Sequence, residues 1–234
     1  MRFMTRRWIA LALAGALALG AASAAGTTAT SAGATAAPAG ATAASALAEL
    51  KAGNGRHMKH HYVHPHQTAS RMHALADGQH PHAIVLSCSD SRVPPEIVFD
   101  QGLGDLFTVR VAGNVAGDAE LASIEYAVEH LHVPLLVVMG HESCGAVAAA
   151  IEGGEARGHI AALVGVIQPS VEKARALPGD LSTNAVRVNV ETMVTALRSS
   201  HPILDQHVAD GTLVIVGGVY SLKTGAVAWL PDSP

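Results

Sequence analysis

Short apolar runs, separated by polar segments and turns, recur along the chain. Residues Ala83–Ser87 and 135–140 each follow a proline and consist almost entirely of aliphatic side chains. Runs of about four to eight such residues are typical of strands that are buried on both faces. Residues 106–111 form a third run, and residues 213–216 form a fourth that stops at two glycines, where we expect the strand to end. We expect a last short strand over residues 226–230.

Three longer segments carry apolar residues at helical spacing. Residues 118–131 begin with an acidic residue and repeat an apolar side chain every three or four positions, which predicts an amphipathic helix. Residues 159–176 and 183–199 predict two further helices. The order of strand 106–111, helix 118–131 and strand 135–140 is that of a βαβ unit, whose strands run parallel. We therefore predict an α/β fold in which helices cover a mainly parallel β-sheet.

The first 24 residues have the layout of a secretory signal. Arg2, Arg6 and Arg7 precede an apolar stretch that ends at the small residues 22–24, as in cleaved signal peptides. An uncleaved membrane anchor is the alternative, but the apolar stretch is shorter than the ~20 residues that span a bilayer. We expect residues 1–24 to direct export to the periplasm. The paired arginines suit the twin-arginine route, and the Sec route stays open.

Residues 25–44 consist almost entirely of alanine, threonine, glycine and serine. This composition lacks the large apolar groups that a packed core needs, so we predict a low-complexity leader. Residues 45–234 are enough for one sizeable core, and we predict a single catalytic domain there. Loss of the signal removes three arginines and no acid, which moves the formal charge from -4 to -7 with histidine neutral. Such a charge argues against nucleic acid as a partner.

The chain has two cysteines, Cys88 and Cys144, so in an oxidising compartment a disulfide is the first alternative. Two buried thiols that act as small apolar residues are another. The neighbouring residues favour a metal site instead. Asp90 and Arg92 follow the first cysteine, and His141 stands three residues before the second. Because both groups follow predicted parallel strands, whose carboxyl ends gather ligands, two thiols and one imidazole should meet at one edge of the sheet.

Thiolate sulfur and imidazole nitrogen are ligands that Zn²⁺ prefers in tetrahedral sites. Cys88, His141 and Cys144 supply three of them, and no further cysteine exists to close the site. The fourth position is then available to water, or to Asp90 in a closed resting state. An open position is typical of a catalytic zinc. We expect one Zn²⁺ per chain.

Four motifs carry a family resemblance. They are CSDSRVPPE from Cys88, RVAGN from Arg110, SIEYAVEHL from Ser123 and GHESCGAV from Gly140. Together they resemble the β-class carbonic anhydrases, and the resemblance extends over residues 45–231. It implies a zinc lyase that reversibly hydrates carbon dioxide to bicarbonate and a proton by means of zinc-bound hydroxide.

The resemblance also implies roles for individual residues. Cys88, His141 and Cys144 match the zinc ligands. Asp90 and Arg92 match a catalytic dyad, in which the arginine draws the carboxylate away from the metal so that it can accept a hydrogen bond from the bound hydroxide. Zinc can lower the pKa of its water from 15.7 to about 7. Because two thiolates leave less positive charge than three imidazoles would, we expect activity to favour neutral to alkaline pH.

One subgroup of the family lines its carbon dioxide pocket with residues that have counterparts here: Gln79, Phe107, Ala112 and Tyr126. The alanine is smaller than the branched residue expected there, so the pocket should be roomier, and Val111 stands where many relatives have asparagine. The other subgroup closes at low pH by binding bicarbonate in a second pocket built from a tryptophan, an arginine and a tyrosine. Only Arg110 has a counterpart there, so we predict the open, non-allosteric type.

Five histidines crowd the segment before the first strand: His57, His60, His61, His64 and His66. Because imidazole titrates near neutral pH, this His-rich segment, residues 57–66, could relay protons or scavenge metal. It could instead be a solvated arm. It also resembles the N-terminal helices with which the family embraces a neighbouring subunit, and the resemblance implies a homodimer or a dimer of dimers.

Two other functions stay open. Relatives that hydrolyse carbonyl sulfide or carbon disulfide are implied to share the fold and the zinc, and pocket size decides between these substrates and carbon dioxide. A periplasmic zinc-binding protein would store metal on the His-rich segment. It would hold several labile zinc ions per chain and would lack hydratase activity.

Overall fold

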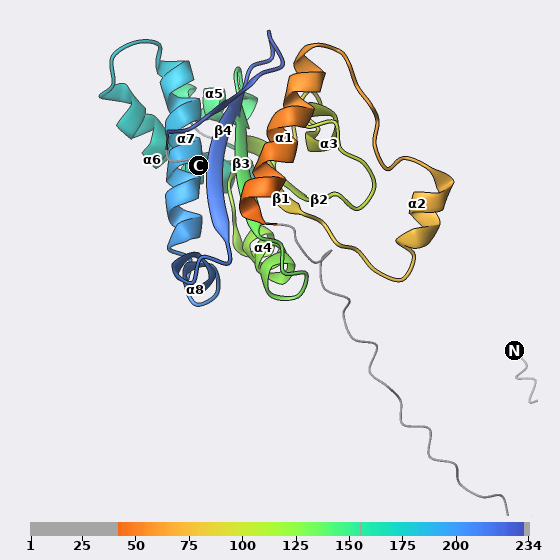
Figure 1. The fold of residues 1–234 in the computed structure, drawn as a ribbon. Helices are drawn as coiled ribbons and strands as arrows, with labels where there is room; N and C mark the ends of the chain where they lie inside the picture. The colour runs from red at the N-terminus through yellow and green to blue at the C-terminus, as the bar shows by residue number, and fades with distance from the viewer. Residues whose placement is uncertain (1–41, 155, 232–234) are drawn as a thin grey trace, which may run out of the picture. The chain divides into compact units, whose positions relative to one another are not determined.

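A five-stranded sheet forms the centre of the folded domain (Figure 1). The computed structural model describes residues 42–154 and 156–231. The strands are β1 Ala83–Ser87, β2 Leu106–Arg110, β3 Leu135–His141, β4 Val214–Tyr220 and β5 Val227–Trp229. They lie in the order β2-β1-β3-β4-β5, and each neighbouring pair is parallel except β4 and β5, which are antiparallel. The prediction of an α/β fold with a mainly parallel sheet is confirmed.

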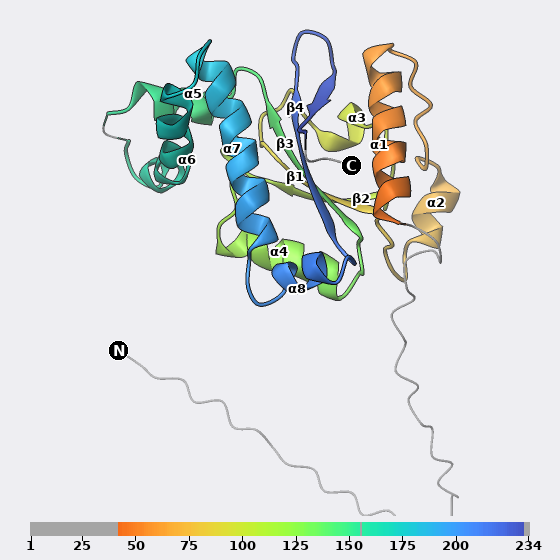
Figure 2. The same ribbon diagram turned by 60° about the vertical axis from the view of Figure 1, so that its left-hand side comes forward.

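Helices cover both faces of this sheet. The helical segments are α1 Ala43–Met58, α2 Ala69–Ala74, α3 Pro95–Val98, the 3₁₀ turn η1 Ala112–Asn114, α4 Asp118–Glu129, α5 Gly145–Glu152, α6 Ile160–Arg175, α7 Leu181–Arg198 and α8 Leu204–Ala209. Figures 1 and 2 place α1 against one face and α7 against the other, and α6 packs on α7. Every residue of β1 and β3 is buried. Burial on both faces accounts for the uninterrupted apolar sequence of these central strands.

The predicted elements are present with small shifts at their ends, apart from one strand. We expected β4 to end at the two glycines, and it instead continues through them to Tyr220. A Cβ at Gly217 would lie 2.6 Å from Cδ1 of Leu230 and 2.8 Å from Cγ1 of Val190. A Cβ at the next residue, Gly218, would lie 2.7 Å from Cγ1 of Val227 in β5. The glycines therefore let α7 and the chain end pack closely against the strand, and they do not terminate it.

The folded domain begins slightly earlier than predicted. Helix α1 starts at Ala43, because Thr42 and Ser45 form a capping box with backbone-to-hydroxyl distances of 3.1 and 3.0 Å. Ala43 and Ala44, which we assigned to the leader, therefore belong to the helix. The predicted signal, residues 1–24, lies outside the described residues, as do the rest of the leader and the last three residues. Within the described part, no helix has both the length and the apolarity needed to cross a membrane.

The His-rich segment is tied to the folded domain at two points. The ring nitrogens of His57 form hydrogen bonds with the hydroxyls of Tyr62 and Tyr220 at 2.8 and 2.9 Å. Nδ1 of His66 lies 2.7 Å from the buried carboxylate of Asp105. His66 is nevertheless exposed, as are the other three histidines, His60, His61 and His64. Two of the five histidines thus make hydrogen bonds to the domain, although only His57 among the five is partly buried.

Asp100 anchors the backbone of the same segment. This carboxylate is 2% exposed and accepts hydrogen bonds from Nε of Arg56 at 2.6 Å and from the backbone N–H groups of Val63 and His64 at 3.0 and 3.1 Å. Burial alone would raise the pKa of Asp100, but the three donors lower it overall. The ionised carboxylate thus holds residues 63 and 64 against the domain.

Candidate metal centre

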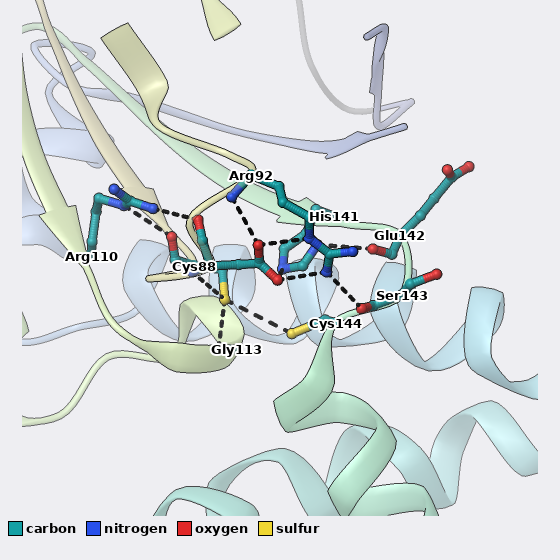
Figure 3. Close-up of polar contacts among 9 residues, drawn as sticks. Cys88, Arg92, Arg110, Gly113, His141, Glu142, Ser143 and Cys144 are labelled. Carbon is teal, nitrogen blue, oxygen red and sulfur yellow. Dashed lines mark hydrogen bonds and ion pairs between the residues drawn. The ribbon is translucent and has the colours of Figure 1, made fainter. Parts of the chain in front are cut away.

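The carboxyl ends of β1 and β3 bring the three predicted ligands together (Figure 3). The strands are parallel neighbours, so Cys88, directly after β1, and His141, at the end of β3, reach the same edge of the sheet. Cys144 follows in a tight turn and is the N-cap residue of α5. One ligand atom from each residue lies within 4.8 Å of the other two, and all three residues are buried. The predicted convergence is confirmed.

The two cysteines are free thiols rather than a disulfide. Their sulfur atoms are 3.9 Å apart, nearly twice the ~2.05 Å of an S–S bond. Two thiolates on one tetrahedral zinc, each at ~2.3 Å from the ion, would be about 3.8 Å apart. The observed separation therefore fits two ligands of one metal ion and contradicts the disulfide alternative.

His141 presents one ring nitrogen to the two sulfurs. Its Nδ1 donates to the backbone carbonyl of Glu142 at 2.8 Å, an arrangement usual for histidines that bind zinc through the other nitrogen. Nε2 is buried and has no hydrogen-bond partner among the described residues. Burial favours the neutral ring, but the nearby Cys88 sulfur raises the pKa of His141 overall. Because an unpaired buried nitrogen is costly and a metal would satisfy it, the residues fit a zinc ion.

Of the two cysteines, Cys88 loses its proton more readily. The Cys144 thiol and the nearby His141 imidazole lower the pKa of Cys88 to about 4, although burial opposes this shift. The backbone N–H groups of Gly113 and Asp90, at 3.3 and 3.4 Å from its Sγ, act in the same direction. The proton shared with Cys88 raises the pKa of Cys144. A metal ion must therefore displace one remaining thiol proton when it binds.

The Arg92 guanidinium donates to both oxygens of the Asp90 carboxylate. Its Nε lies 2.9 Å from Oδ1, and its Nη2 lies 2.6 Å from Oδ2. These bonds hold the pKa of Asp90 far below its usual range. Oδ2 is 3.8 Å from Nε2 of His141, and the arginine also donates to the carbonyl of Ser143 at 3.3 Å. Asp90 thus lies beside the ligand group, and both of its carboxylate oxygens accept hydrogen bonds from Arg92.

Arg110 is a part of the site whose role we did not predict. We considered it only as a remnant of a bicarbonate pocket. Its Nε donates to the carbonyl of Cys88 at 3.0 Å and its Nη2 to the carbonyl of Asp90 at 2.7 Å. The register of β1 against β2, which pairs Ser87 with Arg110, places the guanidinium there. Arg110 therefore clamps the loop that carries a metal ligand and the carboxylate.

The four predicted pocket residues do not gather at one place. Ala112 begins the turn η1, whose next residue donates to Cys88 Sγ. Phe107 is the second residue of β2, and its ring centroid lies 6.3 Å from that of Tyr126, a residue that is 48% exposed. Gln79 is exposed and precedes β1, whereas Cys88 follows it, and a strand of that length spans about 17 Å. A single chain thus brings Ala112, but not Gln79, to the metal ligands.

An α/β sheet that presents two thiols and one imidazole at its carboxyl edge has the donor set of a zinc protein. The sequence model of the carbonic anhydrase family matches residues 83–227. Carbonic anhydrase 2 of Mycobacterium tuberculosis is 42% identical over 180 residues, which cover 75% of this chain and 87% of that protein. The carbonic anhydrase of Mycolicibacterium smegmatis is 42% identical over 182 residues, which cover 76% and 88%.

Solved structures agree with this assignment. A β-carbonic anhydrase of Coccomyxa, in complex with acetazolamide, has a TM-score of 0.62 and 29% identity over 68% of this chain and 75% of that one. A tetrameric β-carbonic anhydrase of Sordaria macrospora has a TM-score of 0.62 and 26% identity over 80% and 95%. The chain belongs to the carbonic anhydrase family, and within it to the β class.

Proposed function

We propose that this chain catalyses the reversible hydration of carbon dioxide to bicarbonate and a proton. The observation that carries the proposal is the buried group of Cys88, His141 and Cys144 with the Asp90–Arg92 ion pair beside it. The three ligands would hold one zinc ion, which when bound supplies a Lewis acid that makes water nucleophilic near neutral pH. Three protein ligands would leave the zinc one further position for a small molecule.

Asp90 acts as a hydrogen-bond acceptor rather than as a general base. Because Arg92 donates to both of its oxygens, the pKa of Asp90 lies well below its usual range, which favours the ionised carboxylate as an acceptor. Its Oδ2 faces Nε2 of His141 at 3.8 Å, so it borders the open position. An acceptor in this place orients a nucleophile that carries a hydrogen. Arg92 acts through Asp90 and is a positioning residue.

We propose that the substrate pocket is completed by a second copy of the chain in a homodimer or a dimer of dimers. Carbon dioxide is small and apolar, and its site needs apolar walls and one hydrogen-bond donor. Ala112 supplies a wall next to the metal ligands. The donor Gln79 lies at the opposite end of β1 from Cys88, so within one chain it is remote from the site. The exposure of Tyr126, near the sheet edge formed by β2, supports a contact with another subunit.

Mixing two inactive variants tests this shared pocket. Gln79→Ala retains its metal ligands, and Cys88→Ser retains its glutamine. If sites are shared, heterodimers of the two contain one complete site, and mixing after mild dissociation should restore part of the activity. Sedimentation of the unaltered protein should show a dimer or a tetramer. A monomer, or dimers that regain no activity on mixing, would show that each chain builds its own pocket.

Stopped-flow measurement of carbon dioxide hydration, with zinc quantified per chain, tests the reaction itself. We expect about one zinc per chain and a rate that rises from neutral to alkaline pH, whereas Cys88→Ser should lose both metal and activity. Protein that holds zinc yet does not accelerate hydration would contradict the proposal. Sulfide release from carbonyl sulfide or carbon disulfide, assayed on the same sample, would then identify the alternative substrate.

The alternative of a zinc-storage protein receives little support. Among residues 42–154 and 156–231, only Cys88, His141 and Cys144 form a group of three or more side chains placed to hold a metal. The histidines of the His-rich segment form no second group there. Storage would require several zinc ions per chain, and the zinc count of the same experiment decides this point.

We further propose that residues 1–24 export the enzyme to the periplasm. Three arginines followed by an apolar stretch and a small-residue cleavage site support this. Fractionation of cells that produce the full chain should place the processed protein in the periplasm. Changing Arg6 and Arg7 together to lysine should abolish export by the twin-arginine route and leave export by the Sec route intact. Retention of an unprocessed chain in the cytoplasm would contradict export.

A further inference from the structure

The Cys88 sulfur accepts two backbone hydrogen bonds from different parts of the chain. One donor, the N–H of Asp90, belongs to the same loop as the cysteine. The other, the N–H of Gly113 at 3.3 Å, comes from the turn after β2. Gly113 has a φ of 73° and a ψ of 14°, in the left-handed region that glycine enters freely. Because glycine has many alternative conformations, another group must hold its N–H against the sulfur.

Asn189 on α7 supplies this constraint. Its Nδ2 donates to the carbonyl oxygen of Gly113 at 2.8 Å, and its side chain is 0% exposed. Packing confines the same glycine, because a Cβ there would lie 2.7 Å from Cδ1 of Ile167 and 3.2 Å from Cβ of Ala146. The N–H and the carbonyl of one residue are linked through its two backbone dihedral angles. A fixed carbonyl therefore restricts the direction of the Gly113 N–H.

The oxygen of the Asn189 amide has no such contact among the described residues. Its Oδ1 is buried and finds no hydrogen-bond partner in the described part of the chain. An unpaired buried acceptor is costly, and the neighbouring positions of α7 are filled by buried apolar residues such as Val186 and Val190. An apolar side chain at position 189 would avoid that cost. The presence of an asparagine at position 189 therefore indicates that its Nδ2 donor is needed, and this donor binds the carbonyl of Gly113.

We propose that Asn189 is a positioning residue of the metal centre, which keeps the Gly113 N–H on the Cys88 sulfur. An N–H donor withdraws charge from a thiolate and fixes its direction, and such outer contacts tune both metal affinity and ligand strength. Asn189 thus acts on the zinc site from a helix on one face of the sheet. The inference rests on the zinc site of the proposed function and is independent of the substrate.

Cobalt(II)-substituted protein offers a readout that does not depend on turnover, because its thiolate-to-cobalt charge-transfer band reports the electron density on sulfur. Asn189→Ala should move this band to lower energy, since the sulfur loses a donor. Zinc affinity, measured by competition with a chelator, should fall by about 10- to 100-fold. Turnover is measured in parallel on the zinc-loaded variant.

Asn54→Ala is the matched control. Asn54 is 4% exposed, donates to the carbonyls of Val98 and Gly225, and accepts from the N–H of Val227. Its loss should destabilise the fold at least as much as the loss of Asn189, because more hydrogen bonds are removed. The cobalt band and the zinc affinity should nevertheless stay unchanged, since this amide does not contact the turn that carries Gly113.

An unchanged band and affinity in Asn189→Ala, or equal changes in Asn54→Ala, would make Asn189 a purely structural residue. If Asn189→Ala does not fold, Asn189→Ser replaces it, because the shorter serine hydroxyl can donate within its own helix. In unaltered cadmium-113 protein, scalar coupling between the Gly113 amide proton and the metal should be transmitted through sulfur, and its absence would overturn the first step. Failure of the protein to bind cobalt at all would instead contradict the zinc site.

Discussion

The metal centre and the His-rich segment are both rich in side chains that bind metals, but only the first is arranged as a site. In the metal centre, three ligands from the ends of two strands and the start of a helix converge within 4.8 Å. The His-rich segment has five imidazoles between residues 57 and 66, and they contribute to no such group in the described structure. A metal site thus depends on whether the fold brings ligand side chains together at one point, and not on how many such side chains a segment contains.

The backbone of the His-rich segment explains why its imidazoles stay apart. His60, His64 and His66 adopt φ values of 54°, 47° and 54°, which are typical of tight turns. His57 and His66 are in addition held by tyrosine hydroxyls and by a carboxylate. His57 and His66 therefore serve local structure, and none of the five histidines joins two other ligand side chains at one point in the described structure.

The largest effect is expected from the metal ligands. His141→Ala should reduce bound zinc from about one ion per chain to nearly none and abolish hydration, because two thiolates alone do not complete the site. Denaturing mass spectrometry without reductant should show two free thiols in the parent. His57→Gln, which changes a histidine of the other region, is the control and should keep its zinc. Equal zinc loss in both variants would erase the distinction between the regions.

The next effect concerns the carboxylate beside the ligands. Asp90→Asn removes the negative charge that Arg92 holds, and it should lower kcat/KM by about 10- to 100-fold while zinc stays bound. The reason is that the amide presents a donor where an acceptor is needed. Stopped-flow hydration and metal analysis on the same sample measure both quantities. Full activity in this variant would show that Asp90 takes no part in the reaction.

A smaller effect on stability should come from His57 as the pH falls. Burial lowers the pKa of His57 in the folded chain, with a smaller contribution from His60. A histidine with a depressed folded pKa binds protons more readily when unfolded, so its contribution to stability is fully present above its unfolded pKa of about 6.5 and decreases below it. His57→Gln should therefore lose less stability than the parent between about pH 6.5 and the lower folded pKa. Parallel stability curves for the two proteins would contradict this assignment.

The smallest effect is expected from the exposed histidines. Replacing His60, His61 and His64 by glutamine should leave kcat/KM unchanged and lower kcat by less than about tenfold in weak buffer, because exposed imidazoles can pass protons to solvent and glutamine cannot. Concentrated buffer should restore the rate. Identical rates at every buffer concentration would remove the proton relay and leave the segment a structural role.

Local signals explain which elements were predictable. Strands β1 and β3 were expected from apolar runs preceded by proline, since burial on both faces requires such runs. Helix α1 begins two residues before the expected domain start, because Thr42 and Ser45 form a cap within an alanine-rich stretch whose composition suggested a leader. By sequence alone Gly217 and Gly218 suggest the end of a strand, whereas the packing of α7 and β5 determines their role.

Some residues of the site were likewise predictable from the sequence, and others were not. Cys88, His141 and Cys144 were identifiable because chemistry requires these residue types after adjacent strands. The clamp by Arg110 depends on the register of β1 and β2 and joins residues 20 and 22 positions apart. The bond from Asn189 to Gly113 spans 76 residues. Neither contact can be recognised from the neighbouring sequence, since nothing around Arg110 or Asn189 distinguishes it from other arginines or asparagines.

The sequence by itself thus determined the fold class, the three candidate metal-binding residues and the family, because apolar periodicity and ligand chemistry are properties of residue type and spacing. The tertiary structure decided the rest. It separated Gln79 from Cys88 by the length of β1. It also brought Arg110 into contact with the carbonyls of Cys88 and Asp90, and Asn189 into contact with the carbonyl of Gly113. These relations depend on strand direction, register and helix packing, which are set by the burial of the whole core rather than by any one segment.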